Sequence, residues 1–318
     1  MPARPTRRIC LFAGHDSKGV VHDYVVHLIE GLSRFSDVHY FSDNDLADAE
    51  REKLAGIATI CGGHRHGRYD FGSWAKMIER LGWETIGEFD ELILANDSCY
   101  GPFTDLAAIC DDMAACSCDF WGMTGSREIA FHIQSYFIVF KRRVIADPDF
   151  RQFWTTIRQE SRYEDIVEKY EIGLSRLLAG KGFVPSTHLR SKLNENLTIF
   201  PLTTVRDRGM PFVKVKCFRD PYIGSRERIS LLFRFLRENH APVARLIGRH
   251  QEAGFLSRAI IDQNREPPVY FNLGFVRMRS IRGSRLKIIL FDKWRIIIRL
   301  PLAWMKKLSR WRCLHVRL

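Results

Sequence analysis

The chain has 318 residues, about twice the length of a typical domain, so one large α/β domain with appendages, or two domains, is expected. Its 46% hydrophobic and 27% charged residues are typical of a globular protein and exclude disorder as the main state. The net charge of +12 is concentrated in residues 281–318, where eleven Lys and Arg against Asp292 supply +10 and leave +2 for the rest. The charge therefore excludes a nucleic-acid surface along the whole chain.

The cysteine pattern and the first residues favour an intracellular protein. The eight cysteines contain no C-x-x-C pair, so a zinc ribbon is not indicated. We identify no signal peptide after Met1 and no run of about 18 apolar residues that could span a bilayer. We expect a cytoplasmic protein, or one peripheral to the inner face of the cell membrane.

The first 45 residues predict strand, loop, helix, strand. Ile9–Ala13 is a short apolar strand, Gly14–Gly19 is a polar loop, Val21–Leu32 has apolar residues at helical spacing, and Val38–Phe41 returns to strand character. This βαβ opening predicts a parallel sheet covered by helices. The loop lacks the Gly-Lys-Ser/Thr ending of a phosphate-binding P-loop, which excludes that motif.

Further elements alternate in the same way as far as about residue 182. Strands are expected at Ile57–Cys61, Phe89–Ala95, Asp119–Gly122 and Ile133–Phe140, and helices at 45–55, Phe71–Leu81, Leu106–Ala115, Phe150–Gln159 and Tyr163–Leu178. The pattern then becomes irregular, with a strand expected at Met210–Phe218, short helices at Ile229–Glu238 and Val243–His250, and a linker at 261–284.

The triplet Asn96-Asp97-Ser98 directly follows the strongest predicted strand. Ligands of open α/β sheets bind outside the carboxyl ends of the strands. A carboxylate beside Mg²⁺ or Mn²⁺ at this point suits a substrate that carries a diphosphate. Alternatively, Asp97 only caps the turn before Gly101-Pro102.

Three more clusters hold candidate polar side chains. Asp70 either caps the helix that follows or reaches a nucleotide. His132 and Gln134 flank an apolar strand and need partners if they are buried. Glu171 lies among apolar neighbours of a helix, where it forms an ion pair or serves as a general base.

Several strings together resemble the rhamnan synthesis protein F family. They occur in order and at family-like spacing over roughly residues 60–250: Tyr69–Trp74, Phe89–Pro102, Asp119–Thr124, His132–Phe137, Lys169–Leu174, and Met210–Lys214 with Phe218–Asp220. The resemblance implies a polysaccharide glycosyltransferase with a GT-A-like Rossmann-type domain and a mixed, mostly parallel sheet. It further implies transfer of rhamnose from a nucleotide-sugar donor to a lipid-linked or polysaccharide acceptor of the cell surface, such as O-antigen.

The resemblance also assigns roles to residues. Asp97 stands where GT-A enzymes place a metal-binding Asp, although Asn96 replaces the first Asp of that motif, and Mg²⁺ or Mn²⁺ is the expected cofactor. The donor-binding residues would be Asp70, Asn96, Asp97, Ser98, His132, Gln134, Lys214 and Arg219. Glu171 would be the catalytic base of an inverting reaction, with Asp119 as the second candidate. Residues 1–200 would form the catalytic domain, 201–260 its C-terminal part, and 261–318 a linker and tail.

The tail is expected to be a basic amphipathic helix over Leu286–Leu300, with tryptophans that suit a membrane interface. Residues 281–318 would then bind an anionic membrane surface, or the helix would dock on the catalytic domain. A catalytically silent carbohydrate-binding relative is an alternative for the whole protein. A nucleic-acid binder acting through the tail is a weaker one, and no nucleic acid is expected.

Overall fold

The computed structural model describes residues 4–127, 129–191, 196–199, 201–219 and 226–252, together with 270–273, 276–281, 285–290 and 294–299. The chain divides into two compact units, Met1–Ser257 and Arg258–Leu318.

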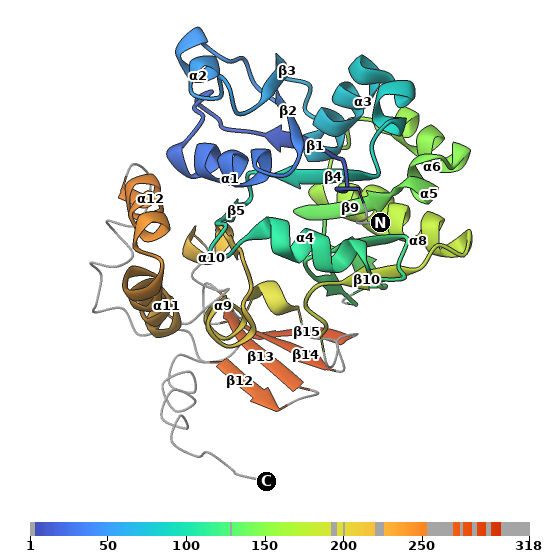
Figure 1. The fold of residues 1–318 in the computed structure, drawn as a ribbon. Coiled ribbons are helices and arrows are strands. Elements are labelled where there is room, and N and C mark those ends of the chain that lie inside the picture. Colours follow the sequence, from blue (N-terminus) through green and yellow to red (C-terminus); the bar gives the residue numbers. More distant parts are fainter. Residues whose placement is uncertain are drawn as a thin grey trace. The chain divides into compact units, whose positions relative to one another are not determined.

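The first unit is built around a seven-stranded sheet of strand order β10-β6-β9-β4-β1-β2-β3 (Figure 1). Its strands are β1 (Arg8–Gly14), β2 (Asp37–Ser42), β3 (Thr59–Gly63), β4 (Glu91–Asn96), β6 (Phe120–Gly122), β9 (Phe137–Lys141) and β10 (Pro185–Thr187). Every pairing is parallel except those of β9, which runs antiparallel to β4 and β6. The predicted α/β class with a mixed, mostly parallel sheet is confirmed.

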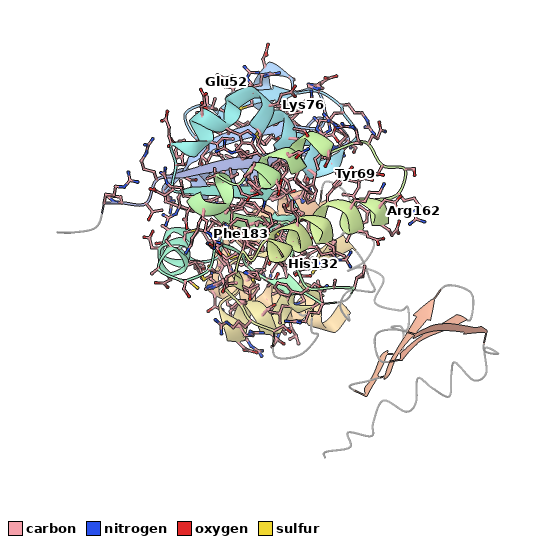
Figure 2. All side chains as sticks on the ribbon, turned by 90° about the vertical axis from the view of Figure 1, so that its right-hand side faces the viewer. Glu52, Tyr69, Lys76, His132, Arg162 and Phe183 are labelled. Carbon is pink, nitrogen blue, oxygen red and sulfur yellow. The ribbon has the colours of Figure 1, made fainter. Side chains whose placement is uncertain are left out.

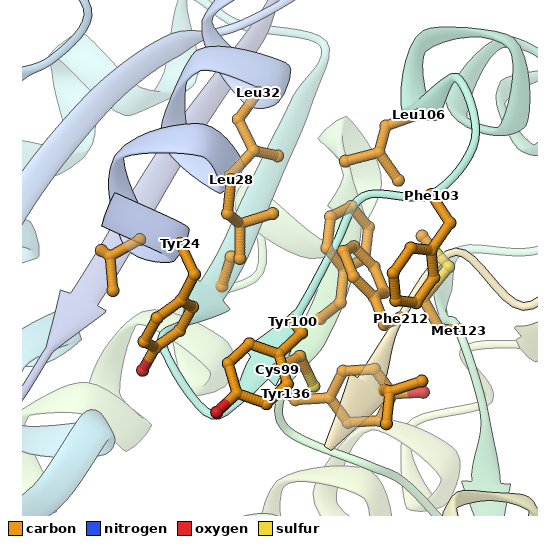
Figure 3. Close-up of a cluster of buried hydrophobic side chains, with 14 of the residues drawn as sticks. Tyr24, Leu28, Leu32, Cys99, Tyr100, Phe103, Leu106, Met123, Tyr136 and Phe212 are labelled. Carbon is orange, nitrogen blue, oxygen red and sulfur yellow. The ribbon is translucent and has the colours of Figure 1, made fainter. Parts of the chain in front are cut away.

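Helices cover both faces of the sheet because the strand residues alternate in direction. Cys10 and Phe12 of β1 pack with α1 (Asp23–Ser33) and α4 (Leu106–Ala114). Ile9 and Leu11 pack with α3 (Tyr69–Gly87), α6 (Pro148–Phe153) and α8 (Gly173–Gly180). Figure 3 shows part of the first layer, where Tyr24 of α1 and Tyr100 meet with their ring centres 4.9 Å apart.

Eleven further helices and strands in the described part of the chain complete this unit. They are α2 (Asp48–Glu52), β5 (Cys99–Tyr100), β7 (Gly125–Ser126), β8 (His132–Ile133), α5 (Arg142–Ile145), α7 (Tyr163–Ile166), α9 (Pro201–Arg208), β11 (Val213–Lys214), α10 (Lys216–Arg219), α11 (Arg226–Asn239) and α12 (Ala241–Glu252). A π-helical turn at Val167–Ile172 joins α7 to α8, and 3₁₀ turns lie at Trp154–Thr156 and Leu197–Ile199. No helix of the described residues is long and apolar enough to cross a membrane.

Two predicted strands differ from the observed ones. The strand expected at Ile133–Phe140 is divided into β8 and β9 by a turn at Ser135 and Tyr136. The strand expected at Met210–Phe218 is wrong over most of its length, because only Val213 and Lys214 pair, with β5, and α10 follows. Apolar alternation marks buried positions there, but it does not supply a partner strand.

The predicted helix over Leu286–Leu300 is wrong. The described residues of the second unit form an antiparallel sheet of order β12-β13-β14-β15, with β12 (Tyr270–Leu273), β13 (Val276–Ile281), β14 (Arg285–Leu290) and β15 (Trp294–Arg299). The supposed linker 261–284 thus contains two strands. Runs of isoleucine at 288–289 and 296–298 favour strands over helices because Ile is β-branched. The remaining tail, 300–318, lies outside the described residues.

A buried ion pair joins the first residues of the two central strands, β1 and β4. Arg8 Nε donates to Glu91 Oε2 at 2.7 Å, and both side chains are 3% exposed. Arg8 and Glu91 are also direct partners in the β1–β4 register. The second guanidinium nitrogen reaches Asp111 Oδ1 at 2.8 Å.

We expect Arg8→Met to lower the free energy of unfolding by about 3–5 kcal/mol, because it leaves Glu91 buried without its cation. Arg206→Ala, which breaks the exposed pair with Asp207, should cost about 1 kcal/mol or less. Urea unfolding of the two variants measures the difference. Equal losses in both would show that the buried pair does not hold the central strands.

Candidate active site

The chain reverses its direction of winding across the sheet between β1 and β4. Strand β1 lies between β2 and β4, so the loops that leave β1 and β4 diverge at the carboxyl ends. Open α/β sheets bind ligands at this position, which we call the crevice. The loop after β1 begins with His15, whose backbone N–H donates to Asp97 Oδ2 at 2.6 Å. Tyr24 Oη donates to the Asp97 carbonyl oxygen at 2.9 Å. Asp97 therefore joins the two loops at this point.

Asn96 connects three of the predicted donor-binding residues. Its Nδ2 donates to Asp70 Oδ2 at 2.7 Å, and its Oδ1 accepts from Ser98 N–H at 3.1 Å and Ser98 Oγ at 2.6 Å. Lys214 Nζ donates to Ser98 Oγ at 3.1 Å. Because Asn96 is 3% exposed and both ends of its amide are engaged, it orients the other polar groups.

The polar chain continues into the domain beyond Lys214. Lys214 Nζ lies 4.3 Å from the centre of the Tyr136 ring, and Tyr136 Oη is 2.7 Å from Thr124 Oγ1. Thr124 Oγ1 donates to Gln134 Oε1 at 2.7 Å. The structure thus brings Gln134 into the same network as Asp70, Asn96, Ser98 and Lys214, which are scattered over residues 70–214.

Two carboxyl groups at the crevice have pKa values well above the ordinary 3.8. Burial and the nearby charge of Asp70 raise the pKa of Asp97 to about 7. Burial raises the pKa of Asp70 to about 6, against the attraction of the Lys214 ammonium. Neighbouring acids removed from water are typical of sites that bind cations or move protons.

Glu171 lies on the π-helical turn Val167–Ile172. Its Oε1 accepts the Ser135 backbone N–H at 2.7 Å, which fixes the carboxylate beside the turn between β8 and β9. Its charge contributes, after burial and other neighbours, to the raised pKa of Asp70, so the two carboxylates lie in one neighbourhood. Single π-turns inside helices occur frequently at functional sites because they redirect one side chain.

Three of the predicted site residues are not brought into this network by the described contacts. Asp119 precedes β6 and therefore lies where the parallel strands begin, whereas Asp97 lies where they end. Asp119 forms an ion pair with Arg143 at 2.9 Å. His132 Nδ1 is 2.9 Å from the carbonyl oxygen of Ala130 in the loop before β8. Arg219 ends α10, and its side chain lies outside the described residues.

Asp43 escaped the sequence analysis although it directly follows β2. Asp43 Oδ1 accepts the backbone N–H groups of His66 at 2.6 Å and Gly67 at 3.0 Å. His66 Nε2 lies 3.0 Å from Ser73 Oγ, so Asp43, His66 and Ser73 resemble a hydrolytic triad. His66 Nδ1, however, accepts the Arg68 N–H at 3.1 Å and cannot donate to Asp43. The group therefore shapes the loop before α3.

Burial lowers the pKa of His66 to about 4 and keeps the ring neutral. Ser73 is 1% exposed, so no substrate can approach its hydroxyl. Both observations agree with a structural role. The rule that polar residues follow strand ends would have identified Asp43 but not its hydrogen-bond partners.

The carboxylate ligands at the crevice fit a divalent cation only together with phosphate oxygens. Among the described residues, no group of three or more His, Cys, Asp and Glu side chains could hold a metal ion by itself. Mg²⁺ commonly binds one or two carboxylates together with substrate phosphates. Asp97, with Asp70 beside it, can supply that protein share, whereas the Asn96 amide is already engaged.

We expect Asp97→Asn to stabilise the protein at neutral and alkaline pH. Between pH 3.8 and about 7, the folded protein holds a proton on Asp97 that the unfolded chain has released, so the free energy of unfolding falls as pH rises. The amide removes this fall and still accepts from His15. At pH 8 the gain should be about 1–2 kcal/mol after allowance for solvent screening. Thermal unfolding from pH 4 to pH 8 measures it, and parallel profiles of variant and wild type would contradict the expectation.

Two curated relatives share part of the sequence. Virulence protein VirA of Vibrio anguillarum is 27% identical over 187 residues, covering 48% of this chain and 60% of VirA. Uncharacterized protein y4gN of Sinorhizobium fredii is 23% identical over 173 residues, covering 53% of this chain and 45% of that protein. The chain spans about half the length of these curated relatives.

Solved structures resemble the chain loosely. Glycosyltransferase GlyE of Streptococcus pneumoniae TIGR4 gives a TM-score of 0.39 at 11% identity, covering 78% of this chain and 64% of GlyE. Core-mannan synthase A of Aspergillus fumigatus, in a Mn/GDP form, gives a TM-score of 0.32 at 8% identity, covering 54% of this chain and 70% of the synthase chain. Likeness at this level assigns no residue role to this chain.

The rhamnan synthesis protein F family matches residues 38–252, a range that includes Asp70, Asp97, Glu171 and Lys214. This match covers more than half of the chain and confirms the resemblance found in the sequence. The chain belongs to the rhamnan synthesis protein F family.

Proposed function

We propose that the protein is a glycosyltransferase of GT-A type that transfers a sugar, rhamnose in the first instance, from a nucleotide-sugar donor to a cell-surface polysaccharide acceptor such as O-antigen. The observation that carries the proposal is the convergence of Asp70, Asp97, Lys214 and Glu171 at the crevice between β1 and β4. Membership in a family described by rhamnan synthesis supports the choice of sugar.

The donor diphosphate is proposed to lie against Asp97 and Lys214. Lys214 Nζ is held by Ser98 and by the Tyr136 ring, so its charge is oriented before the donor arrives. A Mg²⁺ or Mn²⁺ ion held by Asp97 would stabilise negative charge on the leaving diphosphate. The same proposal assigns donor contacts to Asp70, Asn96, Ser98 and Gln134. Asn96 holds Asp70 and Ser98, and Ser98 in turn accepts from Lys214.

Glu171 is proposed as the general base. One of its oxygens is held by Ser135 N–H, which orients the carboxylate toward an acceptor hydroxyl. Removal of the hydroxyl proton by Glu171 allows the oxygen to attack the anomeric carbon, while the bond to the nucleoside diphosphate breaks and the configuration inverts. Asp119 is a weaker candidate because it pairs with Arg143 at the opposite edge of the sheet.

A lipid-linked acceptor and an anionic membrane surface remain part of the proposal. The eleven Lys and Arg of residues 281–318 support membrane attraction, but the interfacial helix on which that expectation rested is replaced by strands β14 and β15. Sedimentation of the protein with vesicles rich in anionic lipid tests the attraction separately from catalysis.

We expect the purified protein to release nucleotide from one member of a nucleotide-sugar panel that includes dTDP-rhamnose, assayed with and without Mg²⁺ or Mn²⁺. Lys214→Met should weaken donor affinity by about tenfold or more, since a charge contact to phosphate is lost. Lys216→Met, two residues away and exposed, is the matched control and should retain the affinity. Absence of release from every donor, with oligosaccharide acceptor present, would favour the catalytically silent carbohydrate-binding relative.

We expect Glu171→Gln to lower the rate of sugar transfer by about 10²–10⁴-fold, the usual contribution of a general base, with donor affinity unchanged. Glu168→Gln changes an exposed residue of the same π-turn and should leave the rate within about twofold. Single-turnover transfer and donor titration separate the two effects. A Glu171→Gln variant that keeps the wild-type rate would exclude Glu171 as the base.

A further inference from the structure

Two exposed tyrosines, Tyr69 and Tyr163, lie against each other near the crevice. Their side chains are 48% and 60% exposed, whereas the large hydrophobic residues of the first unit are mostly buried. Their ring centres are 5.9 Å apart and the ring planes are inclined by 57°. Figure 2 shows Tyr69 and Arg162, the residue before Tyr163, on the same side of this unit. We call this exposed pair of rings, Tyr69 and Tyr163, the aromatic corner.

Tyr69 is held in a backbone conformation that tyrosine rarely adopts. Its φ of 55° is the only positive φ of a non-glycine residue among the described residues. The left-handed conformation costs roughly 1–2 kcal/mol for a residue with a Cβ. The preceding loop imposes it, since Asp43 accepts the N–H groups of His66 and Gly67, and His66 accepts that of Arg68. The strained backbone is not offset by burial of the Tyr69 side chain, which favours a role for this residue in binding a ligand.

The aromatic corner is connected to both proposed reaction groups. Tyr69 directly precedes Asp70, which accepts from Asn96 in the crevice. Tyr163 begins the helical run that carries Glu171 two turns later. Desolvation of its hydroxyl, followed by the charges of Glu171 and Asp70, raises the pKa of Tyr163 to about 12, although most of the ring is exposed. Tyr163 and the two carboxylates therefore lie in one neighbourhood.

We propose that Tyr69 and Tyr163 form the acceptor subsite, where the apolar C–H face of a pyranose ring of the acceptor saccharide packs against the aromatic corner. The inference rests on the proposed glycosyltransferase function and extends it to the acceptor. The donor diphosphate is assigned to Asp97 and Lys214, so a sugar held at Tyr163 presents its hydroxyls from the Glu171 side. Aromatic rings suit this task because they offer a large, rigid apolar surface with little loss of side-chain entropy.

Three variants test the subsite by binding, independently of turnover. The probe is a synthetic tri-rhamnoside, and its affinity is measured by isothermal titration and by saturation-transfer NMR. Tyr163→Ala and Tyr69→Gly should each raise its dissociation constant about five- to tenfold, and Tyr163→Phe by twofold or less, since the ring is kept. Tyr69→Gly is chosen because glycine accepts φ of 55° without strain, so this variant should unfold at a temperature no lower than the wild type.

Val184→Ala removes an exposed apolar side chain elsewhere and is the matched control, with no change expected. Donor affinity and donor hydrolysis should stay within twofold in all variants. If the donor instead binds more weakly in Tyr163→Ala while the tri-rhamnoside binds as before, the pair stacks on the nucleobase and the acceptor proposal is wrong. If folded variants bind both ligands like the wild type, the pair has no ligand. Saccharide binding needs no turnover, so the two proposals fail separately. An inactive wild type would overturn the proposed function, whereas an unchanged tri-rhamnoside affinity in Tyr163→Ala would overturn the subsite.

Discussion

The parallel pairing of β1 with β4 is the constraint on which the remaining structure depends. The register joins Arg8 to Glu91 at one end and Ala13 to Asn96 at the other, and the strand residues between them are buried on both faces. A slip of one residue would exchange the two faces and separate Arg8 from Glu91. At the other end, the same slip would remove the His15 N–H from Asp97. One register therefore fixes a buried ion pair and the geometry of the crevice together.

The sequence predicted what is local and missed what depends on distant partners. Short apolar runs predicted β1, β2 and β4, and the position after β4 predicted Asn96, Asp97 and Ser98, because a strand end is readable from its own residues. Lys214 entered only through the family resemblance. Glu171 was a candidate base from its position in a predicted helix, but no spacing places either residue at the crevice. The sequence correctly placed Asp119 beside β6. Whether Asp119 lies at the same end of the sheet as Asp97 depends on the direction of that strand, which the sequence does not state.

The tail illustrates the opposite failure, in which a local pattern was interpreted with the wrong period. Basic and apolar residues in 285–299 fit one side of a helix, yet the same residues pair as β14 and β15, with Ile288 opposite Ile296. Charges four residues apart satisfy both a helical face and a strand face, so their spacing cannot decide between them. The β-branched isoleucines were the discriminating signal, because their restricted rotamers favour the pleated backbone.

The two ends of the parallel strands differ in a way that argues for function without reference to any relative. The end where β4 begins contains conventional ion pairs: Arg8 with Glu91, Arg142 with Asp90, and Arg143 with Asp119. The carboxyl end instead contains unfavourable features: desolvated Asp70 and Asp97, a positive φ at Tyr69, and a π-turn at Glu171. Each feature costs stability or needs support from its neighbours, and all four lie around one crevice. A ligand that takes up the carboxylate charge and covers the exposed rings would offset these costs, so the crevice is expected to be most stable when it is occupied.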